Sequence, residues 1–195
     1  SSIIGDNMVL QRNAPVVLWG WDDAGTKVSV SIGGSSATAT AGKDGSWSVS
    51  LPAMKAGGPH EIAINGSSKL NIKNVLVGEV WFCSGQSNME WSIRQSMNAQ
   101  EEIAASNHPN IRLFNVPGHT TSPKPQEVGK GNWVVCSPKT SSGFSAVGYY
   151  FGRRLQKELD LPIGLIGSNW GGTRIEPWTT LAGFESVSEL SKIAD

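Results

Sequence analysis

The first 74 residues alternate between apolar and polar positions in short stretches. Alternation with a period of two is typical of β-strands that have one buried face, and the three-to-four-residue spacing of a helix is not found in this part of the sequence. Turn-forming residues separate the stretches, as in Lys43-Asp44-Gly45. The strands expected on this basis are Val16–Trp21, Lys27–Ile32, Ser35–Ala41, Ser46–Leu51, His60–Asn65 and Lys69–Ile72. The pattern predicts an N-terminal all-β sandwich over residues 1–74.

A different pattern begins at Val75 and continues to Asp195. Val75–Cys83 is a mostly apolar run with β-branched residues, which is typical of a parallel strand buried on both faces. Further elements follow in alternation: a helix at Ala99–Ala105, a strand at Ile111–Val116, a helix at Phe144–Leu159 and a strand at Ile163–Ser168. This order predicts an α/β domain with a parallel sheet over residues 75–195. Because such sheets usually contain more than three strands, we expect only the N-terminal portion of the domain here.

The helix predicted at Phe144–Leu159 is amphipathic. Apolar side chains recur every three or four residues, with charged and polar residues between them, so we expect the apolar side chains to pack against the sheet. These side chains are Phe144, Val147, Phe151, Leu155 and Leu159.

Charge and composition narrow the class of partner. Sixteen basic residues balance sixteen acidic ones. This balance does not indicate the basic surface that binds nucleic acid or an anionic membrane. No apolar run approaches the roughly 20 residues that cross a bilayer. Cys83 and Cys136 lack metal-ligand spacing. We therefore expect a neutral partner, with neither a metal nor an organic cofactor.

Two Gly-rich polar segments follow predicted parallel strands: Ser84–Asn88 after the first and Ser168–Thr173 after the third. Ligands of open α/β sheets bind beyond the carboxyl ends of the strands. A serine at a tight strand-to-helix turn can expose its hydroxyl there, while the following backbone N–H groups face a developing oxyanion. Ser87 is then a candidate nucleophile. The alternative is that Ser87 only caps a helix, and that residues 169–173 form an ordinary Gly-rich loop.

The segment Gly78–Trp91 resembles the nucleophile block of the sialate O-acetylesterase family. This family is a branch of the SGNH hydrolases and is related to the acetyl xylan esterases. Three more segments are similar to the same family in the same order: Asp6–Arg12, Phe144–Arg153 and Gly164–Thr173. The resemblance spans nearly the whole chain and implies a flavodoxin-like SGNH hydrolase domain after the sandwich.

The resemblance implies a carbohydrate O-acetylesterase, acting on 9-O-acetylated sialic acid or a similar acetylated sugar or glycan, with Ser87 as the nucleophile. It implies an oxyanion hole formed by the N–H of Ser87 and a glycine N–H of the Trp170–Thr173 loop, with Gly172 favoured over Gly171. Members of this family are usually exported or lysosomal, so a secreted, periplasmic or lysosomal location is expected.

The catalytic histidine of this superfamily lies in a later Asp-x-x-His block that the chain does not contain. Its own histidines, which are His60, His108 and His119, lack that context, and we expect them to be structural or exposed. Because a serine without a base is a weak nucleophile, this chain alone should be nearly inactive. The base and its acid are expected on a second chain or a C-terminal fragment of the same precursor.

Several residues near the two turns are candidates to support the site or to bind the substrate. Trp91, Trp170 and Trp178 can stack on a pyranose face, although tryptophan is commonly a core residue. Arg174 can meet a sugar carboxylate, or else pair with Glu176. The remaining supporting candidates are Gln86, Asn88 and Thr173. A rival hypothesis is a non-catalytic carbohydrate-binding or structural module, because sandwich folds host many binding functions.

Overall fold

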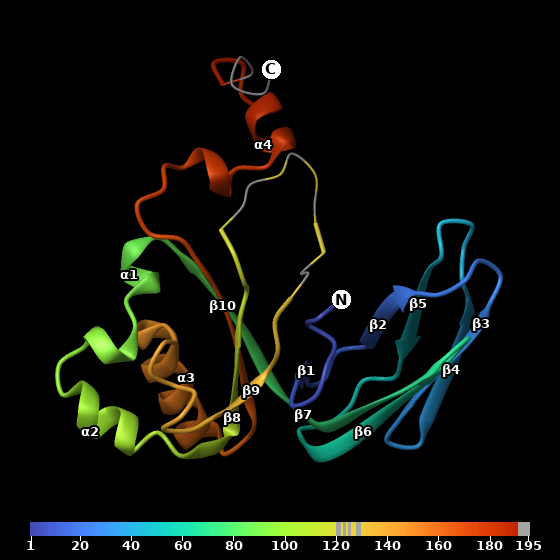
Figure 1. Cartoon of the computed structure of the whole chain (residues 1–195), viewed down its shortest axis with the longest axis horizontal. Helices are drawn as coiled ribbons and strands as arrows, with labels where there is room; N and C mark the ends of the chain where they lie inside the picture. The colour runs from blue at the N-terminus through green and yellow to red at the C-terminus, as the bar shows by residue number, and fades with distance from the viewer. Residues whose placement is uncertain (120–121, 123, 125, 128–129, 191–195) are drawn as a thin grey trace.

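The computed structural model describes residues 1–119, 122, 124, 126–127 and 130–190, and it places two units side by side (Figure 1). The first unit contains β1 (Val9–Gln11), β2 (Val16–Trp21), β3 (Lys27–Ile32), β4 (Ser35–Thr40), β5 (Ser46–Leu51) and β6 (Gly57–Asn65). The second contains α1 (Ser87–Glu90), α2 (Ala99–Ala104), β8 (His108–Asn115), β9 (Val134–Cys136), α3 (Ala146–Leu159), β10 (Ile163–Asn169) and α4 (Leu181–Glu185). Strand β7 (Lys69–Gly85) belongs to both.

Two β layers enclose the core of the first unit. In one layer the order is β4-β3-β6-β7, all antiparallel, with β1 added in parallel to β7. The other layer is the antiparallel pair β2 and β5. The alternation seen in the sequence is reproduced in the burial of β5, where Trp47, Val49 and Leu51 face inward and the serines between them face solvent. The buried residues of both layers form a single hydrophobic cluster.

Strand β7 connects the two units without a break. Its residues up to Gly78 pair with β6 and β1, and its residues from Glu79 onward pair with β10. Val75 and Val77 are fully buried in the core of the first unit. The boundary expected between residues 74 and 75 therefore falls inside this strand. The polar pair Lys73-Asn74 resembles a turn in the sequence, but Asn74 takes a positive φ of 57° and the strand continues past it.

The second unit has a mixed sheet whose three parallel strands follow the order β7-β10-β8, with β9 antiparallel to β8 at the edge. The expected elements are present, and β9 is an addition too short to be recognised from its pattern. In a flavodoxin-like order the first strand would lie between the other two. Here β10 takes the central place, and accordingly Ile163, Gly164 and Leu165 are buried, whereas Trp81 and Phe82 of the edge strand β7 are exposed.

Helix α3 packs on the sheet through small residues rather than through its predicted apolar face. A Cβ at Gly148 would lie 3.0 Å from the Cys83 sulfur, so the helix backbone approaches the strand closely. This approach turns Gly148, Tyr149 and Gly152 inward. The prediction for the apolar face was correct for Phe144, which is 1% exposed, and for Leu155, which is partly buried and packs against the core of this unit. It was wrong for three side chains that remain exposed: Val147 at 52%, Phe151 at 40% and Leu159 at 45%.

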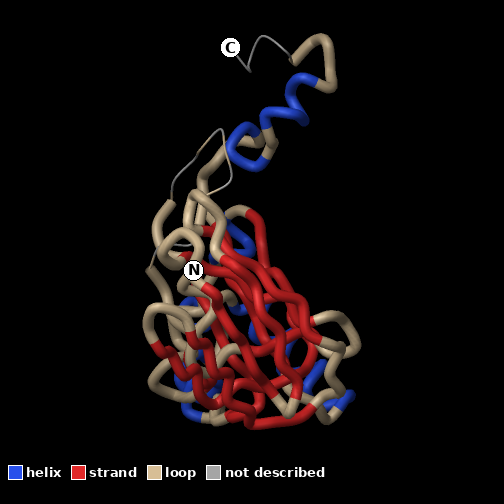
Figure 2. The backbone as a smooth tube through the Cα atoms, turned by 90° about the vertical axis from the view of Figure 1, so that its right-hand side faces the viewer, coloured by secondary structure: helices blue, strands red, loops and turns tan. Residues whose placement is uncertain are grey.

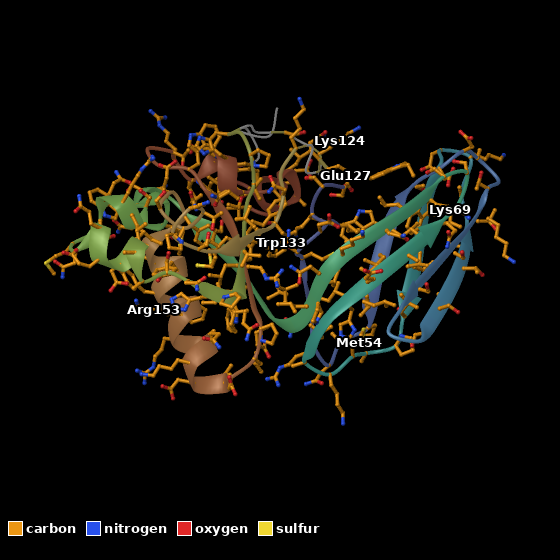
Figure 3. All side chains as sticks on the ribbon, turned by 60° about the horizontal axis from the view of Figure 1, so that its bottom comes forward. Met54, Lys69, Lys124, Glu127, Trp133 and Arg153 are labelled. Atoms are coloured by element: carbon orange, nitrogen blue, oxygen red, sulfur yellow. The ribbon has the colours of Figure 1, made fainter. Side chains whose placement is uncertain are left out.

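Trp133 and Arg112 hold the two units together. Figure 3 shows Trp133 between them, where its indole Nε1 donates to the Ile3 carbonyl oxygen at 2.8 Å. The buried Arg112 guanidinium donates to the carbonyl oxygens of Asn7 and Asn74 at 3.3 and 3.2 Å. Burial lowers the pKa of Arg112, but these acceptors satisfy its N–H groups. Helix α4 lies away from the body of the molecule (Figure 1 and Figure 2). In the part of the chain that the structure describes, no helix is long and apolar enough to span a membrane.

Candidate active site

A cavity of about 460 Å³ lies at the carboxyl ends of the three parallel strands. Ser87 reaches it from the turn after β7, Asn115 from the end of β8 and Asn169 from the end of β10. Parallel strands bring their carboxyl ends to one edge of a sheet, which explains why residues so far apart in sequence meet here. This cavity is the candidate active site.

Ser87 is presented to the cavity by a sharp turn. Gly85 ends β7 with a φ of 148°, a conformation that L side chains rarely adopt, and Gln86 then begins α1 as its N-cap residue. Ser87 is the first residue inside the helix, and its exposed hydroxyl forms no hydrogen bond with any residue that the structure describes. The alternative in which Ser87 caps the helix is therefore wrong, and the hydroxyl is free to meet a substrate.

Three hydrogen bonds join the Ser87 turn to the loop at residues 170–173. The Trp170 N–H donates to the Gly85 carbonyl oxygen at 2.9 Å. The Gln86 amide donates to the Thr173 carbonyl oxygen at 2.6 Å. Between them, the Gly171 N–H donates to Glu90 Oε2 at 2.9 Å. The two Gly-rich segments singled out from the sequence therefore lie against each other.

The two candidate oxyanion donors of this loop differ in their bonding. The Gly171 N–H is occupied by the Glu90 carboxylate. The Gly172 N–H has no partner among the described residues, and Gly172 has a φ of 74°, in the left-handed region that favours glycine. Of the two, only the Gly172 N–H remains available to an oxyanion.

The predicted aromatic residues occupy different positions around the site. Trp91 lines the cavity beside Ser87 and is 52% exposed. One face of Trp170 is covered by His119, with ring centroids 5.1 Å apart and planes inclined by 16°. Trp178 donates its indole Nε1 to Thr173 Oγ1 at 2.8 Å and, with Trp170, lines a neighbouring cavity of about 650 Å³. Of the three tryptophans, Trp91 is the one that lines the same cavity as Ser87.

Four supporting candidates line neither of these two cavities, and the same holds for Gly171 and Gly172. Of the four, Gln86 and Thr173 bond to each other. Asn88 is exposed on α1 and lines neither of them. Arg174 is also exposed, lines neither cavity, and forms no ion pair with a residue in the described ranges. The alternative pairing of Arg174 with Glu176 is accordingly not observed.

Several residues of the cavity were not anticipated from the sequence. Asn115 ends a parallel strand, so the rule that identified Ser87 could have found it too, whereas Asn169 lies in the segment Ser168–Thr173, which this rule identified, but was given no role there. Glu90 follows Ser87 by three residues, which places both on one side of a helical turn. His119 comes from the long loop between β8 and β9, where no periodic pattern indicates its position, and its Nε2 lies 3.7 Å from Glu90 Oε1.

The other two histidines and the thiol of Cys83 do not line the candidate active site. His108 Nε2 is 3.4 Å from the Tyr149 hydroxyl, and burial is the main cause that lowers its pKa. His60 lies in β6 of the first unit. Cys83 lies in β7 shortly before Ser87, and burial raises the pKa of its thiol, which disfavours the reactive thiolate. Within the described residues, no group of three or more His, Cys, Asp or Glu side chains is arranged to hold a metal ion.

Comparisons with known proteins identify relatives of this chain. It is 34% identical to the sialate O-acetylesterase of Rattus norvegicus over 208 residues, which cover 92% of this chain and 37% of the rat protein. The sialate O-acetylesterase of Homo sapiens is 32% identical over 200 residues, covering 92% and 38%. No family model matches the chain.

A solved structure agrees with these sequence relationships. The crystal structure of a carbohydrate acetylesterase from Xanthomonas citri matches with a TM-score of 0.90 and 39% identity, over 93% of this chain and 42% of that one. The chain thus spans about two fifths of the length of the relatives it matches. Its resemblance to the N-terminal part of the sialate O-acetylesterase family is confirmed.

Proposed function

We propose that this chain provides the nucleophile and oxyanion-binding half of a carbohydrate O-acetylesterase. In this proposal, residues up to about Gly78 are a β-sandwich and the remainder begins an SGNH hydrolase domain. The observation that carries the proposal is the contact between the two turns, which places the unbonded Ser87 hydroxyl beside a glycine loop with an unoccupied N–H. The names of the relatives, which are esterases of acetylated carbohydrates, support the same substrate class.

The reaction is an acyl transfer in two steps. Ser87 Oγ attacks the acetyl carbonyl carbon, the bond from that carbon to the sugar oxygen breaks, and the sugar leaves with a proton. Water then attacks the acetyl-serine ester and releases acetate. In both steps the negative oxygen is stabilised by backbone N–H groups, for which Ser87 and Gly172 are our candidates. Trp91 is the candidate to hold the sugar ring.

The proposal requires a base from outside this chain. His119 lines the same cavity as Ser87, but no hydrogen bond connects the two residues, and His119 instead faces Glu90 and Trp170. We propose that the histidine and its acid belong to the part of the longer relatives that this chain does not match. That part would be the C-terminal region of the same precursor, or a second chain derived from it.

The free edge of β7 supports this association. From Glu79 to Gly85 the strand pairs with β10 on one side, and no described strand lies on the other. On β7 and α3, the rings of Trp81 and Phe151 pack in a T-shaped arrangement with their centroids 4.9 Å apart, and both side chains remain exposed. Unpaired strand edges and apolar surfaces favour the addition of further structure. A further strand and helix would cover both features.

The test compares acetate release by the assembled enzyme and by its Ser87→Ala variant, with an acetylated sugar or p-nitrophenyl acetate as substrate. We expect the variant to lose nearly all turnover, by several orders of magnitude, as in other serine hydrolases. Ser48→Ala, which changes an exposed serine of β5, is the matched control and should leave turnover unchanged. Retained turnover in Ser87→Ala would remove Ser87 from the role of nucleophile.

A cavity in the first unit favours a second candidate function, a non-catalytic carbohydrate-binding module. It has a volume of about 280 Å³ and is lined by Trp19, Trp21 and Trp47, of which Trp21 is 52% exposed. An exposed tryptophan can stack on a sugar ring. A binding module would take up the sugar at Trp21 and release no acetate, so measuring both binding and turnover separates the two functions.

A further inference from the structure

We propose that Glu90 is a positioning residue of the esterase site, because it fixes the glycine loop relative to the Ser87 helix. This inference rests on the proposed function. Glu90 Oε2 accepts the Gly171 N–H at 2.9 Å, and Glu90 Oε1 lies 3.7 Å from His119 Nε2. His119 in turn stacks on Trp170, the residue before Gly171. One carboxylate oxygen of Glu90 therefore bonds the loop at residues 170–173 directly, and the other contacts His119, which stacks on the same loop.

Glu90 lies on the same short helix, α1, as the candidate nucleophile Ser87. Ser87 and Glu90 are three residues apart in a single helical turn, so the carboxylate and the nucleophile are carried by the same short element. The hydrogen bond to Gly171 fixes the peptide unit that immediately precedes the Gly172 N–H. Glu90 thus sets the distance and direction between the nucleophile and its candidate oxyanion donor. Errors of about 1 Å in such a distance can cost on the order of 100-fold in rate.

Electrostatics alone would argue against a carboxylate at this place. A negative charge close to a developing oxyanion raises the energy of the transition state. We therefore assign the role of Glu90 in the cavity to the hydrogen bond that it accepts from the Gly171 N–H, and not to its charge. The two properties can be separated experimentally, because glutamine keeps a carbonyl oxygen at the same distance and loses the charge.

The direct experiment compares Glu90→Gln and Glu90→Ala in the assembled enzyme. We expect Glu90→Ala to lower kcat by about 10- to 100-fold with KM changed less than about twofold, since the misplaced donor acts on the transition state. Glu90→Gln should retain kcat within about threefold of the unchanged enzyme, or exceed it. If Glu90→Gln is as inactive as Glu90→Ala, the charge matters rather than the hydrogen bond, and the positioning role is overturned.

Hydrogen exchange of the Gly171 amide provides a readout that needs no turnover. We expect slow exchange of this amide in the unchanged protein and in Glu90→Gln, and at least tenfold faster exchange in Glu90→Ala. Equal exchange in all three proteins would overturn the proposal. If Ser87→Ala retained turnover while the Gly171 amide behaved as expected, the function proposed for Ser87 would fail and the structural role of Glu90 would stand.

Two further variants test the specificity of the effect. His119→Phe keeps an aromatic ring on Trp170 and removes the contact with Glu90, so kcat should fall by less than in Glu90→Ala if Gly171 is the main anchor. A loss as large as that in Glu90→Ala would assign the effect to His119 and overturn the role of the Gly171 bond. Glu102→Gln is the matched control, because Glu102 pairs with Arg153 on α3 and lines neither cavity. It should change neither kcat nor the exchange of Gly171.

Discussion

Gly171 lies against Ser87 so closely that a Cβ at position 171 would come within 3.4 Å of the Ser87 Cα and would overlap the Glu90 carboxylate. Gly171→Ala should therefore displace the loop or break its bond to Glu90. We expect kcat to fall by about tenfold or more, since the candidate oxyanion donor at Gly172 moves with the loop. Gly143→Ala is a suitable control, because a Cβ there would contact nothing within 4 Å although Gly143 also lines the cavity. Full activity of Gly171→Ala would show that the loop tolerates displacement.

The buried Arg112 should be essential to the junction between the two units. Replacing it with Met removes part-buried hydrogen bonds to the carbonyl oxygens of Pro109, Asn7 and Asn74 and takes away their donor at the junction. We expect a loss of about 2 to 4 kcal/mol in the free energy of unfolding, measured by urea denaturation.

Arg154→Met is the control for this measurement. Arg154 is 72% exposed and pairs with Glu158 one helical turn away, and such surface pairs contribute about 0.3 to 0.5 kcal/mol. If Arg112→Met and Arg154→Met destabilise the protein equally, Arg112 does not hold the junction.

Glu79 should make the stability of the junction dependent on pH. The hydrogen bond from Arg12 is the first cause that lowers the pKa of Glu79, and a hydrogen bond from Gln11 adds to it. A carboxyl whose pKa is lowered in the folded state stabilises the protein above its ordinary pKa, and this contribution disappears as the pH falls through the lowered pKa. We expect Glu79→Gln to cost up to about 1 kcal/mol at neutral pH and nearly nothing in acid. A difference that stays constant with pH would contradict this assignment.

Both cysteines should be protected from alkylation in the folded protein. Burial raises the pKa of Cys136 to about 12 and also raises the pKa of Cys83. The thiolate is the reactive form, so iodoacetamide at mildly alkaline pH should label neither thiol until denaturant is added. Mass spectrometry of the digested protein measures the labelling at each position. Rapid labelling of native Cys83 would mean that α3 does not cover β7 at Gly148.

Much of the fold follows from the local pattern of the sequence. The period-two alternation predicted β2 to β6 and the first part of β7, but not the short β1, and the apolar runs predicted the three parallel strands, of which the first is the second part of β7. The pattern could not show that Lys73-Asn74 continues a strand, because contacts of Asn74 such as the hydrogen bond from Arg112 come from more than 35 residues later in the chain. It also could not show that α3 turns its glycines inward, because hydrophobicity does not record how closely two backbones can approach.

The candidate site was predictable where it depends on strand ends. The turn at Ser87 and the loop at residues 170–173 were both identified from a position after a buried strand, and the structure brings them together. Glu90 and His119 were missed for a different reason. Their importance comes from contacts made across the loop, with Gly171 and Trp170, and such contacts leave no periodic signal in the sequence.

The most direct test of the account is covalent labelling of the assembled enzyme with a fluorophosphonate probe, followed by identification of the modified residue. The probe reacts with serines that a base activates beside an oxyanion hole. We expect a single modification at Ser87, absent from Ser87→Ala and retained in Ser48→Ala. Labelling at another serine, or no labelling of an assembly that binds acetylated sugar, would contradict the assignment of Ser87 as the nucleophile.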